Sequence, residues 1–537
     1  MAELRLVGKP ASKGFAAGPL ALLTVISAAE RQKGDPAEEA AALRSAIVRA
    51  RDQLEQLAGN SSDDGAGILA FQIAMLEDEE LAAPAFTRVE QGDAAEATWR
   101  AALDAQIADY QTAGDEHFRA RASDFADIRD RVLAALSGAP TESRLPRGAI
   151  VFADDLTPSR FLSIDWEPGG GIALTRGSAS GHVATLARAR GVPMIVGIEG
   201  APSLADGDRE AFIDGAEGTM ILDPTPVTRA DFIAREAGAR RVIAAAETYR
   251  ARPAVTADGE RIAVLINVAD PAEIEGLDSA TCDGIGLVRT EFLFHGRGQW
   301  PDEERQYRIY RRLVDWAAGK PVTIRTLDAG ADKPIPGLTI DNESNPFLGV
   351  RGIRLSLARP ELFRVQLRAL ARAAAHGPLE VMLPMVALRS ELEAARGLLA
   401  TEAASLSAHG VACAIPPLGI MVEVPAAAIA VEQFDAAFFS IGSNDLTQYV
   451  MAASRDNHAL AALNDPTHPA VLRLIAQVAA HGASIGRKVS LCGDAAAEPA
   501  YVAALLTAGL RALSVAPSAL ARVKQAIAQV DLGGNAR

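Results

Sequence analysis

The sequence is poor in three features, each of which would point to a particular class of protein. It has only three cysteines in 537 residues, Cys282, Cys413 and Cys492, and their number and spacing fit neither a disulfide framework nor a zinc site. Acidic residues outnumber basic residues by 68 to 53, so no basic surplus meets the phosphates of a nucleic acid. No uninterrupted apolar run is long enough to span a bilayer. We therefore expect no nucleic-acid partner and no membrane insertion.

The remaining composition is that of an ordinary globular protein. Hydrophobic residues make up 49% and charged residues 23% of the chain. The length is enough for three or four domains, each able to bury a core. The first residues show no signal-peptide pattern, which together with the scarcity of cysteine predicts a reducing cytoplasm.

The sequence pattern of the N-terminal half changes twice. Residues Leu4 to Ile26 predict one or two strands, and the alanine-rich stretch from Glu30 to Leu136 predicts a bundle of helices, such as one at Ala37–Leu57. Strand-like runs then return, so we expect a compact α/β domain into which the bundle is inserted. These later runs are Gly148–Phe152, Gly171–Leu174, Met194–Val196 and Thr219–Leu222.

The C-terminal half alternates between strand and helix patterns. A long charged helix is predicted at Val227–Arg250, and we interpret it as a linker that ends at Arg252-Pro253. About eight strand–helix units follow, which is the size of a TIM barrel, and a doubly wound sheet is the alternative. The predicted strands are Ile262–Asn267, Gly284–Arg289, Val322–Leu327, Leu379–Pro384, Gly419–Val424, Ala437–Ile441 and Val489–Cys492, with one more near Asn345–Arg354.

One histidine lies in a setting that suits phosphoryl chemistry. Small residues and two glycines between Arg176 and Gly181 lead into His182, and the residues after it predict a helix that ends at Gly191. A helix entrance offers free backbone N–H groups and the positive end of the helix dipole, which favour a phosphoryl group. Taken alone, such a residue is more often a helix cap or a packed histidine, so the case for a nucleophile depends on the rest of the chain.

Polar residues follow the predicted strands of the C-terminal half. Several guanidinium groups at one barrel mouth repel one another unless an anion lies between them. Two carboxylates, Glu423 and Asp445, suit a hard cation such as Mg²⁺. A small phosphorylated carboxylate would satisfy both conditions. The residues at these strand ends are Arg289, Arg325, Arg351, Arg354, Glu423, Asn444, Asp445, Arg455, Cys492 and Asp494.

Together these stretches resemble enzyme I of the bacterial phosphotransferase system, the phosphoenolpyruvate–protein phosphotransferase family. The resemblance extends over nearly the whole chain. The segments that carry it are DLTPS at 155–159, the loop around His182, FQIAMLEDEEL, ASDFADIRDR, GIGLVRTEFLF, IRTLDAGADK, NPFLGVRGIR, IMVEVP, IGSNDLTQY and LCGDAA.

The resemblance implies a multidomain α/β fold. A swivelling phosphohistidine α/β domain carries an inserted helical bundle and is followed by a C-terminal TIM (β/α)8 barrel. The implied boundaries are 1–28 and 140–226 for the phosphohistidine domain, 29–139 for the inserted domain that binds the carrier protein HPr, 227–252 for the linker helix, and 253–537 for the barrel, which binds phosphoenolpyruvate and forms a homodimer.

The resemblance also implies a reaction and a role for each matching residue. His182 would accept the phosphoryl group of phosphoenolpyruvate through Nε2, with Thr157 as its hydrogen-bonding neighbour, and pass it to a histidine of HPr. Cys492 would give the proton that completes pyruvate. The implied contacts are Arg289, Arg325, Asn444, Asp445 and Arg455 for the substrate, with Lys333 and Arg351 in support; Glu423 and Asp445 for Mg²⁺; and Glu77, Glu79, Glu80 and Leu81 for HPr.

Two other functions stay open at this point. A swivelling-histidine dikinase or phosphoenolpyruvate synthase would need an ATP-binding domain, and no glycine-rich phosphate loop precedes His182. A catalytically silent regulatory protein that binds phosphoenolpyruvate is the other alternative. It draws on Gly181 and Val183, which flank the histidine where the family usually has hydroxyl residues.

Overall fold

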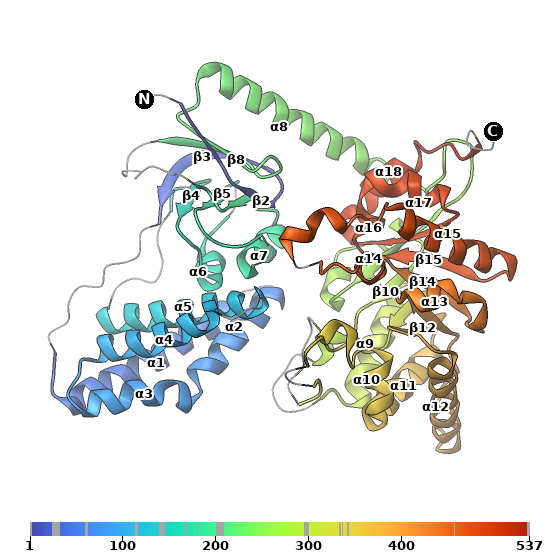
Figure 1. Cartoon of the computed structure of the whole chain (residues 1–537), viewed down its shortest axis with the longest axis horizontal. Coiled ribbons are helices and arrows are strands. Elements are labelled where there is room, and N and C mark those ends of the chain that lie inside the picture. The colour runs from blue at the N-terminus through green and yellow to red at the C-terminus, as the bar shows by residue number, and fades with distance from the viewer. Residues whose placement is uncertain are drawn as a thin grey trace. The chain divides into compact units, whose positions relative to one another are not determined.

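The structure, a computed structural model of the whole chain, divides into two compact units, Met1–Ala239 and Arg240–Arg537 (Figure 1). It describes residues 3–23, 33–59, 63–112, 116–138, 145–166, 169–179, 181–199, 209–294, 300–331, 335, 337–340, 343–455 and 457–533. Lys333, one of the predicted supporting cations, lies outside these ranges.

The first unit is built on an eight-stranded mixed sheet with the order β1-β8-β7-β3-β4-β5-β6-β2. The central strands β3 to β6 run parallel to one another, and the outer pairs are antiparallel. The strands are β1 (Leu4–Val7), β2 (Lys9–Ser12), β3 (Phe15–Leu22), β4 (Ile150–Ala153), β5 (Gly171–Leu174), β6 (Met194–Val196), β7 (Glu210–Asp214) and β8 (Thr219–Leu222).

The predicted helical region separates β3 from β4, and its helices pack as a bundle (Figure 1). Leu43, Leu54, Trp99 and Leu103 are fully buried in its core, which is continuous with apolar residues of the sheet. The helices are α1 (Pro36–Gly59), α2 (Asp63–Leu76), α3 (Glu79–Glu90), α4 (Ala95–Thr112) and α5 (Glu116–Ser137), followed after β4 by α6 (Pro158–Ser163) and α7 (His182–Arg190).

Helix α8 (Pro226–Glu247) is the long charged helix that the sequence predicts. The chain that leaves it is held by a buried lysine, Lys524, whose Nζ donates hydrogen bonds to the carbonyls of Arg250 (2.8 Å), Arg252 (2.8 Å) and Thr281 (2.6 Å). Thr281 precedes the barrel strand β10 (Ile285–Val288), so the anchor lies at the N-terminal ends of the barrel strands.

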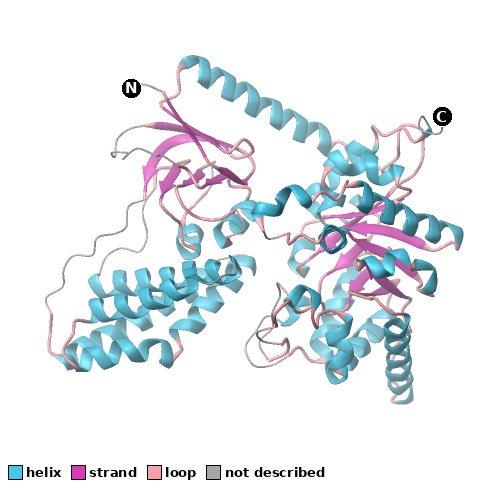
Figure 2. Ribbon diagram, in the orientation of Figure 1, coloured by secondary structure: helices cyan, strands magenta, loops and turns pink. Residues whose placement is uncertain are grey.

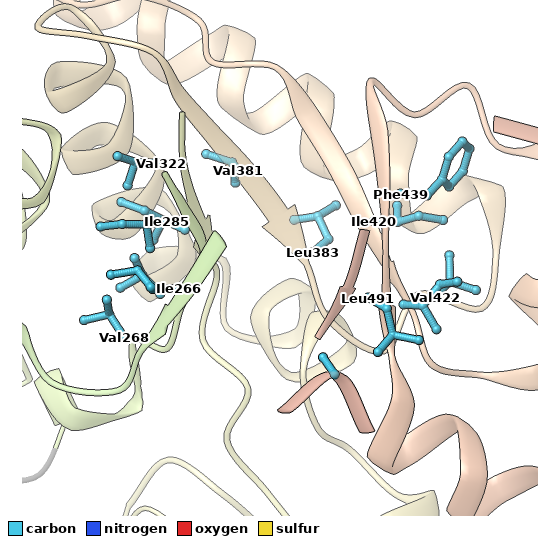
Figure 3. Close-up of a cluster of buried hydrophobic side chains, with 14 of the residues drawn as sticks. Ile266, Val268, Ile285, Val322, Val381, Leu383, Ile420, Val422, Phe439 and Leu491 are labelled. Carbon is cyan, nitrogen blue, oxygen red and sulfur yellow. The ribbon is translucent and has the colours of Figure 1, made fainter. Parts of the chain in front are cut away.

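The second unit contains a closed barrel of eight strands, all paired in parallel (Figure 2). Alternate residues of each strand are apolar and buried under the surrounding helices, as Figure 3 shows for Ile266, Val381, Ile420 and Leu491. The intervening residues point into the barrel and include most of the polar side chains. The strands are β9 (Ala263–Val268), β10, β11 (Val322–Arg325), β12 (Leu379–Leu383), β13 (Leu418–Val422), β14 (Phe438–Gly442), β15 (Lys488–Cys492) and β16 (Ala512–Val515).

Longer and shorter helices lie between and after these strands. They are α9 (Glu303–Trp316), α10 (Ile353–Ala358), α11 (Pro360–Ala374), α12 (Arg389–Ala408), α13 (Pro425–Ile429), α14 (Ser443–Met451), α15 (Pro469–Ser484), α16 (Asp494–Ala497), α17 (Val502–Thr507) and α18 (Leu520–Ile527).

The predicted strand near Asn345–Arg354 is wrong. This segment forms a 3₁₀ turn at Pro346–Leu348 and the start of α10, and the eighth barrel strand is β16. Pro346 has no N–H to donate to a ladder, and Gly352 has a φ of +58°, which strand residues do not adopt. Arg351, at the end of this segment, instead pairs with Asp328 and Asp445.

The buried lysine gives the first prediction. Lys524→Met should lower the free energy of unfolding of the barrel by about 3 kcal/mol, because one buried and two part-buried carbonyls lose their donor. Lys488→Met is the matched control, since its ammonium is largely exposed where it pairs with Glu380, and it should cost less than about 1 kcal/mol. Equal losses in denaturant unfolding of the two variants would contradict the anchoring role of Lys524.

Candidate functional site

His182 is the first residue of α7, as the sequence predicts. Gly181 precedes it at the N-cap and offers no side-chain cap, so the N–H groups of the first turn keep their capacity to donate. The helix ends at Gly191, which has a φ of +67°, a left-handed conformation that glycine adopts without strain. Val183, which stands where the family usually has a hydroxyl, is buried in the apolar core.

The imidazole of His182 faces the helical bundle. Its Nδ1 lies 3.5 Å from Oδ1 of Asp124, a fully buried carboxylate of α5, and no described residue forms a hydrogen bond with Nδ1. Gln72 of α2 donates to both Asp124 (3.3 Å) and Asp127 (3.1 Å). These contacts direct one edge of the ring toward the bundle, so the opposite nitrogen, Nε2, is the one turned away from it.

Asp127 joins the bundle to the first turn of α6. It accepts hydrogen bonds from the backbone N–H (2.8 Å) and the hydroxyl (2.6 Å) of Ser159, and burial raises the pKa of this carboxyl. Thr157 is the N-cap of α6, but its hydroxyl makes no capping hydrogen bond. No hydrogen bond between Thr157 and His182 is present among the described residues, so the predicted role of Thr157 stays a prediction.

The acidic run predicted to bind a carrier forms the turn between α2 and α3. Glu77, Glu79 and Glu80 are exposed and Leu81 is half-buried. Asp78 caps α3 by accepting a hydrogen bond from the backbone N–H of Glu80 (2.9 Å). Glu77 follows Gln72 by five residues, about 7.5 Å along a helix, which brings the run near the Gln72–Asp124–His182 contacts.

In the second unit, a cluster of buried charges lies at the C-terminal ends of the barrel strands. Arg325, the last residue of β11, forms ion pairs with Glu291 (2.9 Å) and Asp328 (3.1 Å). Burial opposes its charge, yet the two carboxylates raise the pKa of Arg325 above its ordinary value. Its buried Nε has no hydrogen-bond partner among the described residues. That N–H is a donor position left for an oxygen of a bound anion.

Arg351 and Arg455 extend the cluster. Arg351 is almost completely buried and pairs with Asp328 (2.9 Å) and Asp445 (3.1 Å). Arg455 lies 3.7 Å from the other oxygen of Asp445 and over the ring of Phe347. Arg351 therefore holds the carboxylates in place from below, whereas the more exposed Arg455 is the cation that a ligand can reach.

Glu423 and Asp445, the predicted magnesium ligands, lie close enough to interact. Glu423 is buried, and its Oε1 accepts a hydrogen bond from the backbone N–H of Met385 (2.6 Å). Burial, together with the charges of Asp445 and Asp328, raises the pKa of Glu423 to about 8. A Cβ at Gly442 would stand 2.7 Å from Oε2 of Glu423, so glycine keeps the space beside that oxygen open. A compact dication would relieve this repulsion, and Mg²⁺ uses one or two carboxylates with substrate oxygens and water.

Cys492 and Asn444 complete this end of the barrel. Cys492 is buried at the end of β15, and burial raises the pKa of its thiol to about 11. Asn444, in the first turn of α14, donates to Asp494 (3.1 Å) and accepts from its backbone N–H (3.0 Å). Gly493 has a φ of +99°, and a Cβ there would meet Ser443 and Asn444, so only glycine allows this approach.

The structure thus brings some of the predicted strand-end residues into the cluster of buried charges and leaves others outside it. Arg289 is exposed at the end of β10, and Arg354 donates to the carbonyls of Leu348 and Gly349, where it stabilises the preceding turn. The residues that sequence analysis missed are carboxylates and amides that hold the predicted ones. They share a detectable signal, a polar residue at a buried position of an otherwise apolar pattern, and they are Gln72, Asp124, Asp127, Glu291 and Asp328.

Comparisons with known proteins agree with this arrangement. Three models of phosphoenolpyruvate-utilising enzymes match the chain: the N-terminal domain at residues 7–121, the mobile domain at 145–218 and the phosphoenolpyruvate-binding domain at 244–532. A phosphoenolpyruvate-protein phosphotransferase of Geobacillus stearothermophilus is 35% identical over 533 residues, which cover 96% of this chain and 92% of that protein. The chain belongs to the phosphoenolpyruvate-protein phosphotransferase family.

Other phosphoenolpyruvate-protein phosphotransferases show similar identity. The Haloferax volcanii protein is 38% identical over 90% of this chain and 86% of its own length, and the Bacillus subtilis protein is 32% identical over 99% and 95%. A solved solution structure of Enzyme I (nEIt) covers 44% of this chain and 99% of its own at 24% identity, with a TM-score of 0.36, which is too low to support an argument. Within the described residues, no helix has the length and apolar character needed to cross a membrane.

The raised pKa of Glu423 gives a prediction about stability. Between pH 4.5 and about 8 the folded chain holds a proton on Glu423 that the unfolded chain has lost, so this residue makes stability fall as pH rises through that window. Glu423→Gln, which keeps the oxygen that accepts from Met385, should therefore raise the melting temperature of the metal-free barrel at pH 8. The gain should shrink by about 1.4 kcal/mol per pH unit toward pH 5. Calorimetry in the presence of a chelator measures it, and a variant less stable than wild type at pH 8 would contradict the assignment.

Proposed function

We propose that the chain transfers the phosphoryl group of phosphoenolpyruvate to His182 and then to a histidine of an HPr-like carrier protein, releasing pyruvate. The observation that carries this proposal is the cluster of buried arginines and carboxylates at the C-terminal ends of the barrel strands. Its unpartnered Arg325 Nε and the reachable Arg455 suit a phosphate, and membership of the phosphotransferase family supports the same reaction.

The barrel residues have separate parts in this proposal. Arg325, Arg455 and Arg289 bind the phosphate and carboxylate of the substrate, Asn444 orients it, and Arg351 positions the carboxylates beneath it. Phosphoryl transfer depends mainly on alignment and on neutralising charge, which these fixed guanidinium groups supply without reorganisation. Glu423 and Asp445 are the residues that would hold Mg²⁺, and the bound ion would neutralise charge on the transferred phosphoryl group.

Cys492 is the proposed proton donor. Once the phosphoryl group has left, the enolate of pyruvate needs a proton at C3, and the release of free energy in this step draws the transfer forward. A thiol with a pKa of about 11 keeps its proton throughout the neutral range, so Cys492 is always in the acid form before the reaction.

His182 and the barrel residues belong to different units, so the proposal requires the first unit to change its orientation between two stations. We place the pivot in α8 and in the Arg252-Pro253 junction that follows it. At the second station the exposed acidic turn at Glu77–Glu80, with Leu81, would attract a carrier whose docking face is basic around an apolar centre. Dimerisation through the barrel is part of the proposal, as is a location in the cytoplasm.

The phosphorylated residue provides the main test. The full-length chain incubated with radiolabelled phosphoenolpyruvate and Mg²⁺ should acquire acid-labile phosphate on His182. His182→Ala should abolish the labelling while phosphoenolpyruvate still binds to the barrel in calorimetric titration. His376→Ala, which removes another histidine that pairs only with Tyr307 and Arg311, should label normally. Labelling retained by His182→Ala would refute the proposal. If His182→Ala lost both labelling and substrate binding, His182 would be needed for binding and not only as the phosphorylated residue.

The proton donor has its own test. Cys492→Ala should slow pyruvate formation by about 10²–10⁴-fold, because a positioned acid contributes that much to a proton transfer. Rapid-quench measurement of pyruvate from one turnover gives the rate. A rate equal to that of wild type would mean that another group protonates C3.

The acidic turn predicts a charge effect confined to one end of α3. Glu80→Lys should lower the rate of phosphoryl transfer to HPr by at least about tenfold at low salt and flatten its dependence on ionic strength. Glu90→Lys makes the same charge change at the exposed far end of this helix and should leave the rate close to that of wild type. Equal effects of the two substitutions would exclude docking at this turn.

A further inference from the structure

The buried thiol raises a question of proton supply. If Cys492 is the acid, which is part of the function proposed above, its sulfur loses a proton in each turnover and must regain one. Its side chain is 2% exposed, so bulk water does not reach the sulfur directly. A path through protein groups is therefore needed beneath the substrate.

Two serine hydroxyls form such a path. Ser440 Oγ donates a hydrogen bond to Sγ of Cys492 (3.7 Å), and Ser490 Oγ donates to Ser440 Oγ (3.2 Å). The thiol in turn donates to the carbonyl of Ile441 (3.5 Å). Both serine hydroxyls therefore donate in the direction of the sulfur, which is the orientation required to deliver a proton there.

The register of β14 and β15 explains why these groups line up. Phe438, Ser440 and Gly442 pair directly with Lys488, Ser490 and Cys492, and alternate residues of both strands face the barrel interior. The column ends at Lys488, whose exposed ammonium pairs with Glu380 at the N-terminal ends of the strands. Ser440 is completely buried and Ser490 is half-buried, so the solvent exposure of these side chains increases with distance from Cys492.

We propose that Ser490 and Ser440 relay a proton from water at the N-terminal end of the barrel to Cys492. In the chemical step the S–H bond of Cys492 breaks and a C–H bond forms at C3 of enolpyruvate. The thiolate then takes the hydroxyl proton of Ser440, Ser440 takes that of Ser490, and Ser490 takes one from water. One solvent proton is consumed for each pyruvate released, and the substrate side of the barrel stays dry.

A structural role alone does not account for the chain of donors. Ser514 is an equally buried hydroxyl on β16, and its hydrogen bond to Oδ1 of Asn267 (2.6 Å) ends there without reaching a titratable group. Ser440 instead contacts the sulfur itself. Burial raises the pKa of the Cys492 thiol, and the hydrogen bond from Ser440 acts in the opposite direction by stabilising the thiolate. The two serines thus act through Cys492 as positioning residues.

An isotope pulse tests the relay with the full-length chain and no carrier. The enzyme is equilibrated in H₂O and diluted into D₂O, and phosphoenolpyruvate with Mg²⁺ is added after a variable delay. Mass spectrometry of the pyruvate methyl group from one turnover then reports how long the enzyme keeps its own proton. Ser440→Ala should retain that proton about ten times longer than wild type, because the path to solvent is broken.

Other variants distinguish a relay from packing. Ser490→Ala should also slow the exchange, Ser490→Thr should restore it because it keeps the hydroxyl, and Ser514→Ala should exchange like wild type. The half-buried Ser490 supplies the test if Ser440→Ala fails to fold. Exchange at the wild-type rate in both Ser440→Ala and Ser490→Ala would overturn the relay and leave the role of Cys492 intact. Transfer of the stored proton by Cys492→Ala would overturn the role of Cys492 itself.

Discussion

The balance of buried charge within the barrel is the constraint on which the site depends. Arg325 and Arg351 are nearly inaccessible, and the charge of each is compensated by Asp328 and a second carboxylate within ion-pair distance. Removing one partner from such an arrangement leaves an uncompensated charge in a medium of low polarity. The buried arginines, the carboxylates and the strand ends that carry them are therefore one structural unit, and their positions are set before any ligand arrives.

The same balance explains why the cluster suits an anion together with a cation. The carboxylates are crowded enough to keep Glu423 protonated in neutral solution, while Arg325 keeps one N–H without a protein partner. A phosphate oxygen can accept a hydrogen bond from this N–H of Arg325, and a metal dication can offset the crowding of the carboxylates. In the proposed reaction, binding of the two ligands would be cooperative on electrostatic grounds, because each removes the cost that the other would meet alone.

Much of this arrangement could be predicted from the sequence, for a physical reason. Parallel strands carry their C-terminal residues to the same end of a barrel, so Arg325, Glu423 and Cys492 could be placed together from the strand pattern alone. The helix at His182 was predictable because Gly181 and Gly191 bound it. The strand expected near Asn345–Arg354 failed because this segment forms a 3₁₀ turn at Pro346–Leu348 with no buried residues, followed by the start of α10.

Contacts between distant segments were beyond prediction. The approach of Asp124 to His182 depends on how α5 packs against α7, and no local pattern contains that information. Likewise, the hydrogen bond from Ser440 to Cys492 follows from the register of two strands about fifty residues apart, which the sequence does not specify. The sequence shows only that a polar residue stands at a position where an apolar residue would be expected to pack.

The anchoring of the chain after α8 by Lys524 also bears on the proposed movement of the phosphoryl group. It attaches the chain that follows α8 to the N-terminal ends of the barrel strands, whereas the cluster of buried charges lies at their C-terminal ends. Helix α8 has 22 residues and is therefore about 33 Å long, comparable with the height of such a barrel and its loops. In the proposed reaction, a small change of direction at the anchored end of α8 would move its other end by a large distance, because displacement grows with the length of the helix.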